Sequence, residues 1–431
     1  MNVLMFGWEF PPNISGGLGT ACYGIVSGLA ACSDVKVIFV VPKTYGNEQS
    51  EKVQLISAEN IPVGSEIFKT FSSSAISFVE VPSKLIPYLS PENFSEKYQF
   101  QTEGKELSEV VNEGTKIHFS GKYGPNLFDE INNYAIVAKT IAQENQFNLI
   151  HAHDWLTFPA GVAAKKISGK PLVVHVHSTD FDRSGGAINP AIFAIEKQGM
   201  DEADEIITVS NLTKKRLIDQ YQIPSKKITT VYNAIEPETN IINTTIKQKH
   251  KEKIVTFLGR ITIQKGPEYF AEVARMVISR MKNVHFVMAG SGELRNRIIE
   301  LCVRYGISDR FHFTGFLKGP EVTEMLHRSD LFIMPSVSEP FGIVPLEAMQ
   351  ANVPVIISRQ SGVSELISNA LKTDFWDIHA MADAVHGVLK YKKLAKTLAF
   401  EGKQEVRKLN WEHAAREIRQ VYLHSLNKQA S

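Results

Sequence analysis

Residues 331–357 constrain the fold most, because they hold a strand, a turn, a helix and a second strand in immediate succession. The apolar run Leu331–Met334 predicts a short buried strand, and Val355–Ser358 predicts another. Between them, residues from about Val344 to Ala351 predict a helix, with Pro345 in its first turn, where a missing N–H costs nothing. Strands that alternate with helices indicate an α/β fold.

The turn between this first strand and its helix carries groups suited to a ligand. Gly342 lets the backbone come close to a ligand, and the free N–H groups at a helix start attract phosphate. Glu339 precedes this anion site and Glu347 lies inside the helix, and carboxylates, which only accept hydrogen bonds, suit hydroxyl groups. Hydroxyls, phosphate and hydroxyls in a row describe a sugar nucleotide. Either glutamate alone is explained by the helix dipole, but the pair favours the ligand.

This segment resembles the donor-binding segment of retaining glycosyltransferases with the GT-B fold, and it is most similar to the glycogen synthase and family 4 group. The resemblance implies that Glu339 lies against the donor sugar as a catalytic residue and that Glu347 holds the ribose. It also implies that the amides of the turn take the diphosphate. The donor-binding residues of the turn are then Phe341, Gly342, Ile343 and Val344.

The N-terminal segment predicts the opening of a Rossmann-like unit. Strand Asn2–Phe6 is followed by a loop, a helix that runs to about Ala31, and strand Lys36–Val41. The loop contains Gly16 and Gly17 but does not match G-x-G-x-x-G, so glycine content alone leaves a flexible turn equally plausible. In the glycosyltransferase group a similar loop closes over the donor phosphates and the acceptor, which assigns Gly16 and Gly17 to donor binding.

Two positions in this loop depart from the bacterial glycogen synthases that use ADP-glucose. Those enzymes carry a lysine before the glycine pair and an aspartate after it, whereas this chain has Ile14 and Thr20. The departures leave the base of the donor unassigned.

Four histidines are predicted at the ends of two neighbouring strands. His151 and His153 are spaced by two residues, as are His175 and His177, so each pair faces one side of its strand. A metal-dependent hydrolase is one interpretation, although a strand-end histidine is more often a structural hydrogen-bonding group. The H-D-W form resembles the glycosyltransferase group, which implies that His153 contacts the donor hexose; we expect no metal.

The second half repeats the alternation of strands and helices. Strand Ile254–Leu258 ends before Arg260, and Lys265 precedes a helix over Gly266–Arg280. Two cations near a strand end are usually only solvated, but they also suit a diphosphate. Their G-R-x-x-x-x-K-G spacing resembles the group's diphosphate clamp, which implies that Arg260 and Lys265 bind the donor and act in catalysis. The resemblance also places Gly290, Phe316 and Leu317 at the donor.

These elements predict two Rossmann-like domains that face each other across a cleft, the GT-B fold. We expect an N-terminal acceptor domain over residues 1–236, with an insertion at about 43–128 that includes strands at Ile76–Val81 and Thr115–Phe119. A linker at 237–252 leads to the donor domain at 253–410. Residues 411–431 are expected to form a helix that crosses back to the first domain.

Composition excludes several other classes of protein. A chain of 431 residues is too long for one core, and its 43% hydrophobic and 22% charged residues are typical of globular proteins. The net charge of +1, without basic or acidic blocks, argues against nucleic acid as a partner. Three cysteines in no ligand spacing, no apparent signal peptide and no apolar run near the ~20 residues that span a bilayer lead us to expect a cytoplasmic protein.

The resemblance implies a retaining transferase that moves a hexose from a nucleotide sugar to a carbohydrate acceptor. Similarity to glycogen synthases favours glucose as the hexose and an α-glucan as the acceptor. Another glycan acceptor, a sugar-nucleotide epimerase and a phosphorylase of the same fold remain alternatives, and a catalytically silent glucan-binding protein is the alternative outside enzymes. No cofactor is expected, because the nucleotide sugar is a co-substrate and two cations take the place of a metal.

Overall fold

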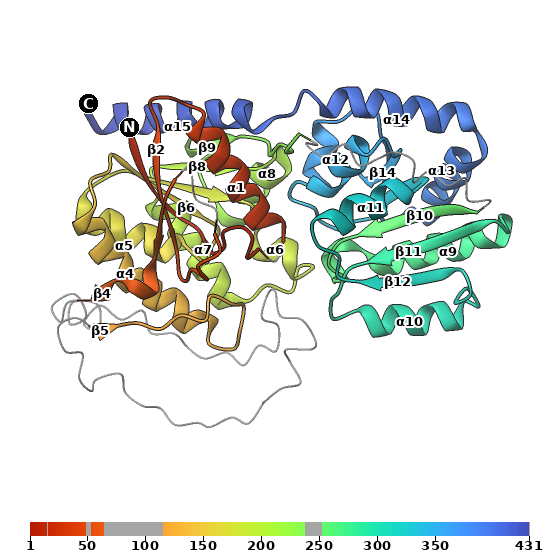
Figure 1. Cartoon of the computed structure of the whole chain (residues 1–431), viewed down its shortest axis with the longest axis horizontal. Helices are drawn as coiled ribbons and strands as arrows, with labels where there is room; N and C mark the ends of the chain where they lie inside the picture. Colours follow the sequence, from red (N-terminus) through yellow and green to blue (C-terminus); the bar gives the residue numbers. More distant parts are fainter. Residues whose placement is uncertain (15, 49–52, 64–114, 238–251, 431) are drawn as a thin grey trace.

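The computed structural model describes residues 1–14, 16–48, 53–63, 115–237 and 252–430. Two parallel β-sheets, each with helices on both faces, lie side by side in the molecule (Figure 1). The earlier sheet is formed by the first half of the chain and the later sheet by the second half. This arrangement confirms the predicted α/β class with two Rossmann-like units.

The N-terminal sheet has seven strands in the order β3-β2-β1-β6-β7-β8-β9, all parallel. Its strands are β1 (Asn2–Phe6), β2 (Lys36–Val41), β3 (Gln54–Ser57), β6 (Leu149–His153), β7 (Leu172–Val176), β8 (Glu205–Thr208) and β9 (Ile228–Thr230). The central strands β6, β7 and β8 are buried along their whole length because helices cover both of their faces, although they include the histidines of β6 and β7.

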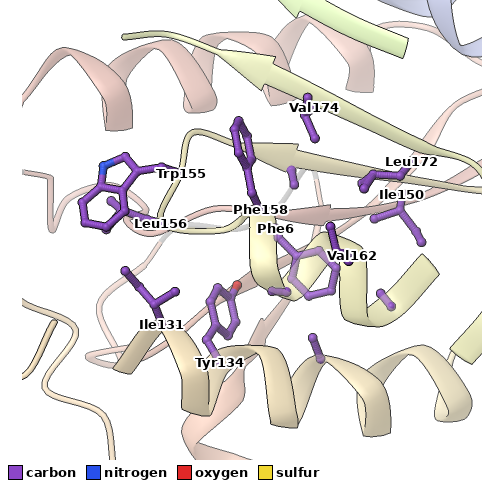
Figure 2. Packing of buried hydrophobic residues seen from close by; sticks show 14 of the residues in the cluster. Phe6, Ile131, Tyr134, Ile150, Trp155, Leu156, Phe158, Val162, Leu172 and Val174 are labelled. Carbon is purple, nitrogen blue, oxygen red and sulfur yellow. The ribbon is translucent and has the colours of Figure 1, made fainter. Parts of the chain in front are cut away.

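Two separate apolar layers cover the faces of this sheet. Phe6 and Ile150 point toward Tyr134 of α4 (Leu127–Glu144) and Val162 of α5 (Phe158–Ser168), as Figure 2 shows. The opposite face packs against α1 (Gly17–Ala30) and α15 (Trp411–Ala430). Further helices of this half are α6 (Asp180–Arg183), α7 (Pro190–Glu202) and α8 (Asn211–Tyr221).

Helix α15 ends the chain but packs on the first half of the molecule (Figure 1). Its Trp411 lies against Gly24 of α1, where an added Cβ would stand 2.1 Å from the indole ring, so only glycine permits this contact. The Tyr422 hydroxyl lies 2.6 Å from Nδ1 of His151 on β6. The last helix therefore closes the face of the sheet that carries the histidines.

The C-terminal sheet has six parallel strands in the order β12-β11-β10-β13-β14-β15. They are β10 (Lys253–Leu258), β11 (Val284–Ala289), β12 (Phe311–Gly315), β13 (Leu331–Met334), β14 (Val355–Ser358) and β15 (Leu371–Thr373). The helices around it are α9 (Pro267–Arg280), α10 (Arg295–Arg304), α11 (Pro320–Arg328), α12 (Ile343–Gln350), α13 (Ile378–Lys390) and α14 (Lys392–Val406).

Strand order reverses at one point in each sheet, between β1 and β6 and between β10 and β13. Open α/β sheets bind ligands outside the carboxyl ends of the strands at such a point. The loops that follow these four strands contain Gly16, Asp154, Arg260 and Glu339. Topology alone thus brings the predicted ligand-binding segments to two facing sheet edges.

The predicted insertion over residues 43–128 needs a correction at its start. Strand β3 pairs in parallel with β2 and extends the core sheet, so Gln54–Ser57 is not part of an insertion. The polar residues on either side of this edge strand made it hard to predict from the sequence. Pro62–Val63 (β4) and Thr115–Lys116 (β5) form a small antiparallel sheet, whereas the strand predicted at Ile76–Val81 and most of the predicted linker lie outside the described residues. Within the described residues, no helix is both long and apolar enough to cross a bilayer.

Candidate active site

A cavity of about 910 Å³ lies between the two halves, with walls from the loops that follow β1, β6, β10 and β13. Its size is within the range of small-molecule sites. All the predicted donor-binding residues line it. These are Gly16, Gly17, Arg260, Lys265, Gly290, Phe316, Leu317, Glu339, Phe341, Gly342, Ile343, Val344 and Glu347.

The turn before α12 forms the centre of the C-terminal wall. Gly342 has φ of 104°, a conformation that L side chains rarely adopt, and it precedes the first residue of the helix. Two backbone hydrogen bonds stabilise the turn. The Glu339 amide donates to the Gln360 carbonyl at 2.9 Å, and the Val363 amide donates to the Phe341 carbonyl at 2.8 Å. The free amides at the start of α12 therefore have a fixed direction.

An ion pair joins two of the three predicted catalytic groups of this wall. The Lys265 ammonium donates to the Glu339 carboxylate, which also accepts from the Ser336 hydroxyl at 3.3 Å. Glu339 is only 6% exposed, so these contacts compensate for the loss of water around its charge. Arg260 is beside them and donates to the Gln264 side-chain oxygen at 3.1 Å. One acid and two cations thus converge on one part of the cavity.

Glu347 lies one turn inside α12 on the same wall. Burial raises the pKa of its carboxyl group to about 7. Its charge is therefore lost near neutral pH and not, as for an ordinary glutamate, in acid.

The loops after β10 and β11 pack closely against each other in the C-terminal wall. Gly290 has φ of 147°, and a Cβ there would stand 1.9 Å from the Gly259 carbonyl oxygen, so no larger residue fits. The strand end that follows β12 presents Phe316, whose side chain is 50% exposed. An exposed aromatic face beside an anion site provides a flat surface on which a planar ring can stack.

The N-terminal wall includes residues that sequence analysis did not assign. Glu9, Asp154 and His177 line the cavity opposite the ion pair. Asp154 has φ of 57°, and its carboxylate accepts from the His177 amide at 2.6 Å. Burial raises the pKa of Asp154 to about 7, although Arg183 opposes this shift. The signal for Asp154 was present in the H-D-W sequence, whereas nothing in the sequence distinguished Glu9.

His153 is the predicted site residue that the structure does not bring to the cavity wall. Its side chain is 1% exposed, and its Nδ1 lies 3.0 Å from Nε2 of His177. Along β6 alternate residues share a face, so His153 points with His151 toward α1 and α15. His153 is not among the residues that line the cavity, and its predicted contact with the donor hexose stays a prediction.

Polar contacts at the turn and at the nearby Glu365 join the C-terminal wall to the N-terminal half. The Ser210 hydroxyl donates to the Pro340 carbonyl at 2.6 Å. The Ser338 hydroxyl donates to the buried Asp182 carboxylate at 2.6 Å. The Glu365 carboxylate accepts from the amides at the start of α8 at 2.7 and 2.9 Å. These contacts fix the position of Glu339 relative to the opposite wall.

Family comparisons agree with this geometry. Residues 239–405 match the family Glycosyl transferases group 1, and residues 99–239 match Glycosyltransferase Family 4. Together the two matches include the residues of the C-terminal wall and much of the N-terminal half.

Individual proteins show the same similarity over nearly the whole chain. An uncharacterized glycosyltransferase of Methanocaldococcus jannaschii is 28% identical, with 98% of each chain covered. A glycogen synthase of Mycobacterium tuberculosis is 24% identical over 98% of this chain and 94% of that protein. The solved sucrose-phosphate synthase of Thermosynechococcus elongatus superposes with a TM-score of 0.72 at 20% identity, with both chains fully covered. The chain therefore belongs to the family 4 glycosyltransferases of the GT-B type.

Proposed function

We propose that the protein is a retaining hexosyltransferase that moves a hexose, most simply glucose, from a nucleotide sugar to a carbohydrate acceptor such as an α-glucan. The observation that carries this proposal is the convergence of Glu339, Lys265 and Arg260 beside the helix start at Gly342. A sugar diphosphate needs hydroxyl acceptors next to anion donors, and this wall supplies both. The similarity to a glycogen synthase supports glucose and an α-glucan.

The proposed donor lies along the C-terminal wall. Its diphosphate contacts the amides of Ile343 and Val344, together with Arg260 and Lys265. Glu339 accepts hydrogen bonds from the hexose, Glu347 accepts them from the ribose, and the base lies near Phe316. A diphosphate competes with Glu339 for the Lys265 ammonium, so donor binding rearranges the ion pair.

In the proposed reaction the bond between C1 of the hexose and the diphosphate oxygen breaks, and its electron pair stays on the diphosphate. The acceptor hydroxyl oxygen forms the new bond to C1 from the same face, which retains the configuration. The proton of that hydroxyl passes to the leaving diphosphate. Arg260, Lys265 and the helix-start amides stabilise the charge that builds on the leaving group, and we propose that no metal takes this part.

A panel of donors tests this function directly. Purified protein is incubated with UDP-glucose, ADP-glucose, GDP-mannose or UDP-galactose, with and without an α-glucan primer. We expect one donor to be consumed only when the primer is present, with release of its nucleoside diphosphate and an α-linked product. Consumption of no donor, or epimerisation without an acceptor, would overturn the proposal.

A further inference from the structure

Four histidines and a cysteine form a buried cluster behind the N-terminal wall. The rings of His151 and His153 on β6 lie 4.2 Å apart, and those of His175 and His177 at β7 lie 4.3 Å apart. Cys22 of α1 completes the cluster from the opposite layer. Each of these side chains is at most 8% exposed. The proposed transfer reaction uses none of them directly.

The polar atoms of this cluster are poorly satisfied. Within the described part of the chain, five of its ring nitrogens have no hydrogen-bond partner. They are Nε2 of His151, Nε2 of His153, both nitrogens of His175 and Nδ1 of His177. Leaving buried nitrogens unpaired costs free energy, whereas Nδ1 of His153 and Nε2 of His177 lie within reach of each other and are not among these five.

We propose that Cys22, His153 and His177 bind a transition-metal ion of the zinc type. The ligand atoms of the three side chains lie within 4.8 Å of one another. Nδ1 of His153 and Nε2 of His177 are 3.0 Å apart, close to the ~3.3 Å between two nitrogens on a tetrahedral zinc ion. One thiolate and two imidazoles form a ligand set that zinc and cobalt favour.

A second triad of His151, His153 and His175 satisfies the same distance limit but is less suitable. Nδ1 of His151 already lies 2.6 Å from the Tyr422 hydroxyl. All three of its members are at most 1% exposed, whereas His177 lines the cavity and gives an ion a route from solvent. The ion would hold His177 in the N-terminal wall through its link to α1.

Cobalt titration tests the site without reference to activity. Chelator-treated full-length protein is titrated with Co²⁺ alone, and absorption is recorded. We expect a thiolate-to-cobalt charge-transfer band that saturates at about one ion per chain. Cys22→Ser should abolish the band, while Cys302→Ser, which alters a buried free cysteine in the other half, should keep it. A titration without a thiolate band, or a band that survives Cys22→Ser, would overturn the proposal.

Variants of the histidines distinguish the two triads. His177→Gln should weaken cobalt binding by at least ~100-fold, whereas His151→Gln should change it by less than ~3-fold. Loss of binding in His151→Gln with retention in Cys22→Ser would contradict the proposed ligand set. The Tm of the unaltered protein should also rise when zinc is added. This measurement decides the outcome if a variant fails to fold, and an unchanged Tm would contradict the site.

Discussion

The two walls of the cavity differ in how their charged groups are gathered. The C-terminal wall takes Glu339 and Glu347 from one strand–turn–helix unit and adds Arg260 and Lys265 from a second. The N-terminal wall collects Glu9, Asp154 and His177 from loops after three different strands. Local sequence therefore describes the C-terminal wall well, whereas tertiary structure alone assembles the N-terminal wall.

The walls also differ in the sign of their charge. Arg260, Lys265 and Lys318 line the cavity from the C-terminal half, but among the described lining residues the N-terminal half supplies acids and no lysine or arginine. Such a division supports an anionic donor on one side and an uncharged, hydroxyl-rich acceptor on the other. Four substitutions test this division, and they are given from the largest expected effect to the smallest.

Arg260→Ala should lower turnover by about 100-fold or more, because the guanidinium stabilises charge that builds on the leaving diphosphate. Steady-state rates with the donor selected by the panel measure the effect. Arg304→Ala, at an exposed position of α10 in the same half, is the matched control and should leave turnover unchanged. Near-normal turnover of Arg260→Ala would show that the C-terminal wall does not hold the diphosphate.

Glu347→Gln should raise the KM for the donor about tenfold and remove a pH dependence. Since burial raises the pKa of Glu347 to about 7, the carboxyl group is ionised above that pH and protonated below it. A protonated group accepts hydrogen bonds from the ribose less strongly, so the donor KM of the unaltered protein should rise as pH falls from about 8 to 6.

The control for that experiment is Glu300→Gln, which alters an exposed acid of α10 and should keep the pH dependence. A donor KM that stays flat between about pH 6 and 8 in the unaltered protein would contradict the role given to Glu347.

Glu9→Gln should raise the KM for the acceptor about fivefold and leave the KM for the donor unchanged, because Glu9 lines only the N-terminal wall. Measurements at saturating donor and varied primer give the acceptor value. Glu144→Gln, an exposed acid near the end of α4, serves as the control. An equal effect on both substrates would remove the distinction between the walls.

Ser338→Ala should have the smallest effect, a fall in Tm of about 1–3 °C with a modest loss of turnover. It removes the hydrogen bond that the hydroxyl donates to Asp182 and the one that it accepts from Arg216, both of which join the turn before Glu339 to the opposite half. Ser279→Ala removes a hydroxyl that bonds only within α9 and should not change the Tm. If both variants melt alike, the contact between the halves contributes nothing measurable.

Much of the fold follows from local sequence patterns. Apolar runs such as Leu331–Met334 predict parallel strands, and Ser210, a residue type that favours helix N-caps, accepts from the Thr213 amide at the start of α8. The prediction failed at β3, where Gln54–Ser57 is too short and too exposed to show a clear pattern. A strand that is buried on one side only gives the weakest signal in a parallel sheet.

For the site, the spacing of residues within one strand–turn–helix unit predicted which of them line the cavity. The directions of side chains on a strand could not be predicted from the sequence. Glu339, Gly342 and Glu347 share one wall because a tight turn and one helical turn leave them little freedom. The sequence did not predict that His153 lies off the cavity wall, because its direction depends on which face of β6 is covered by α1 and α15, and α15 lies far along the chain. Alternation puts His151 and His153 on one face but does not say which face meets the cavity.

The central claim is that an activated sugar binds along the C-terminal wall with its diphosphate at the start of α12. A crystal structure with the nucleoside diphosphate of the selected donor tests it most directly. The account predicts phosphate oxygens within hydrogen-bond reach of the Arg260 guanidinium and of the Ile343 and Val344 amides. A nucleotide bound elsewhere, or one whose phosphates reach none of these groups, would contradict it.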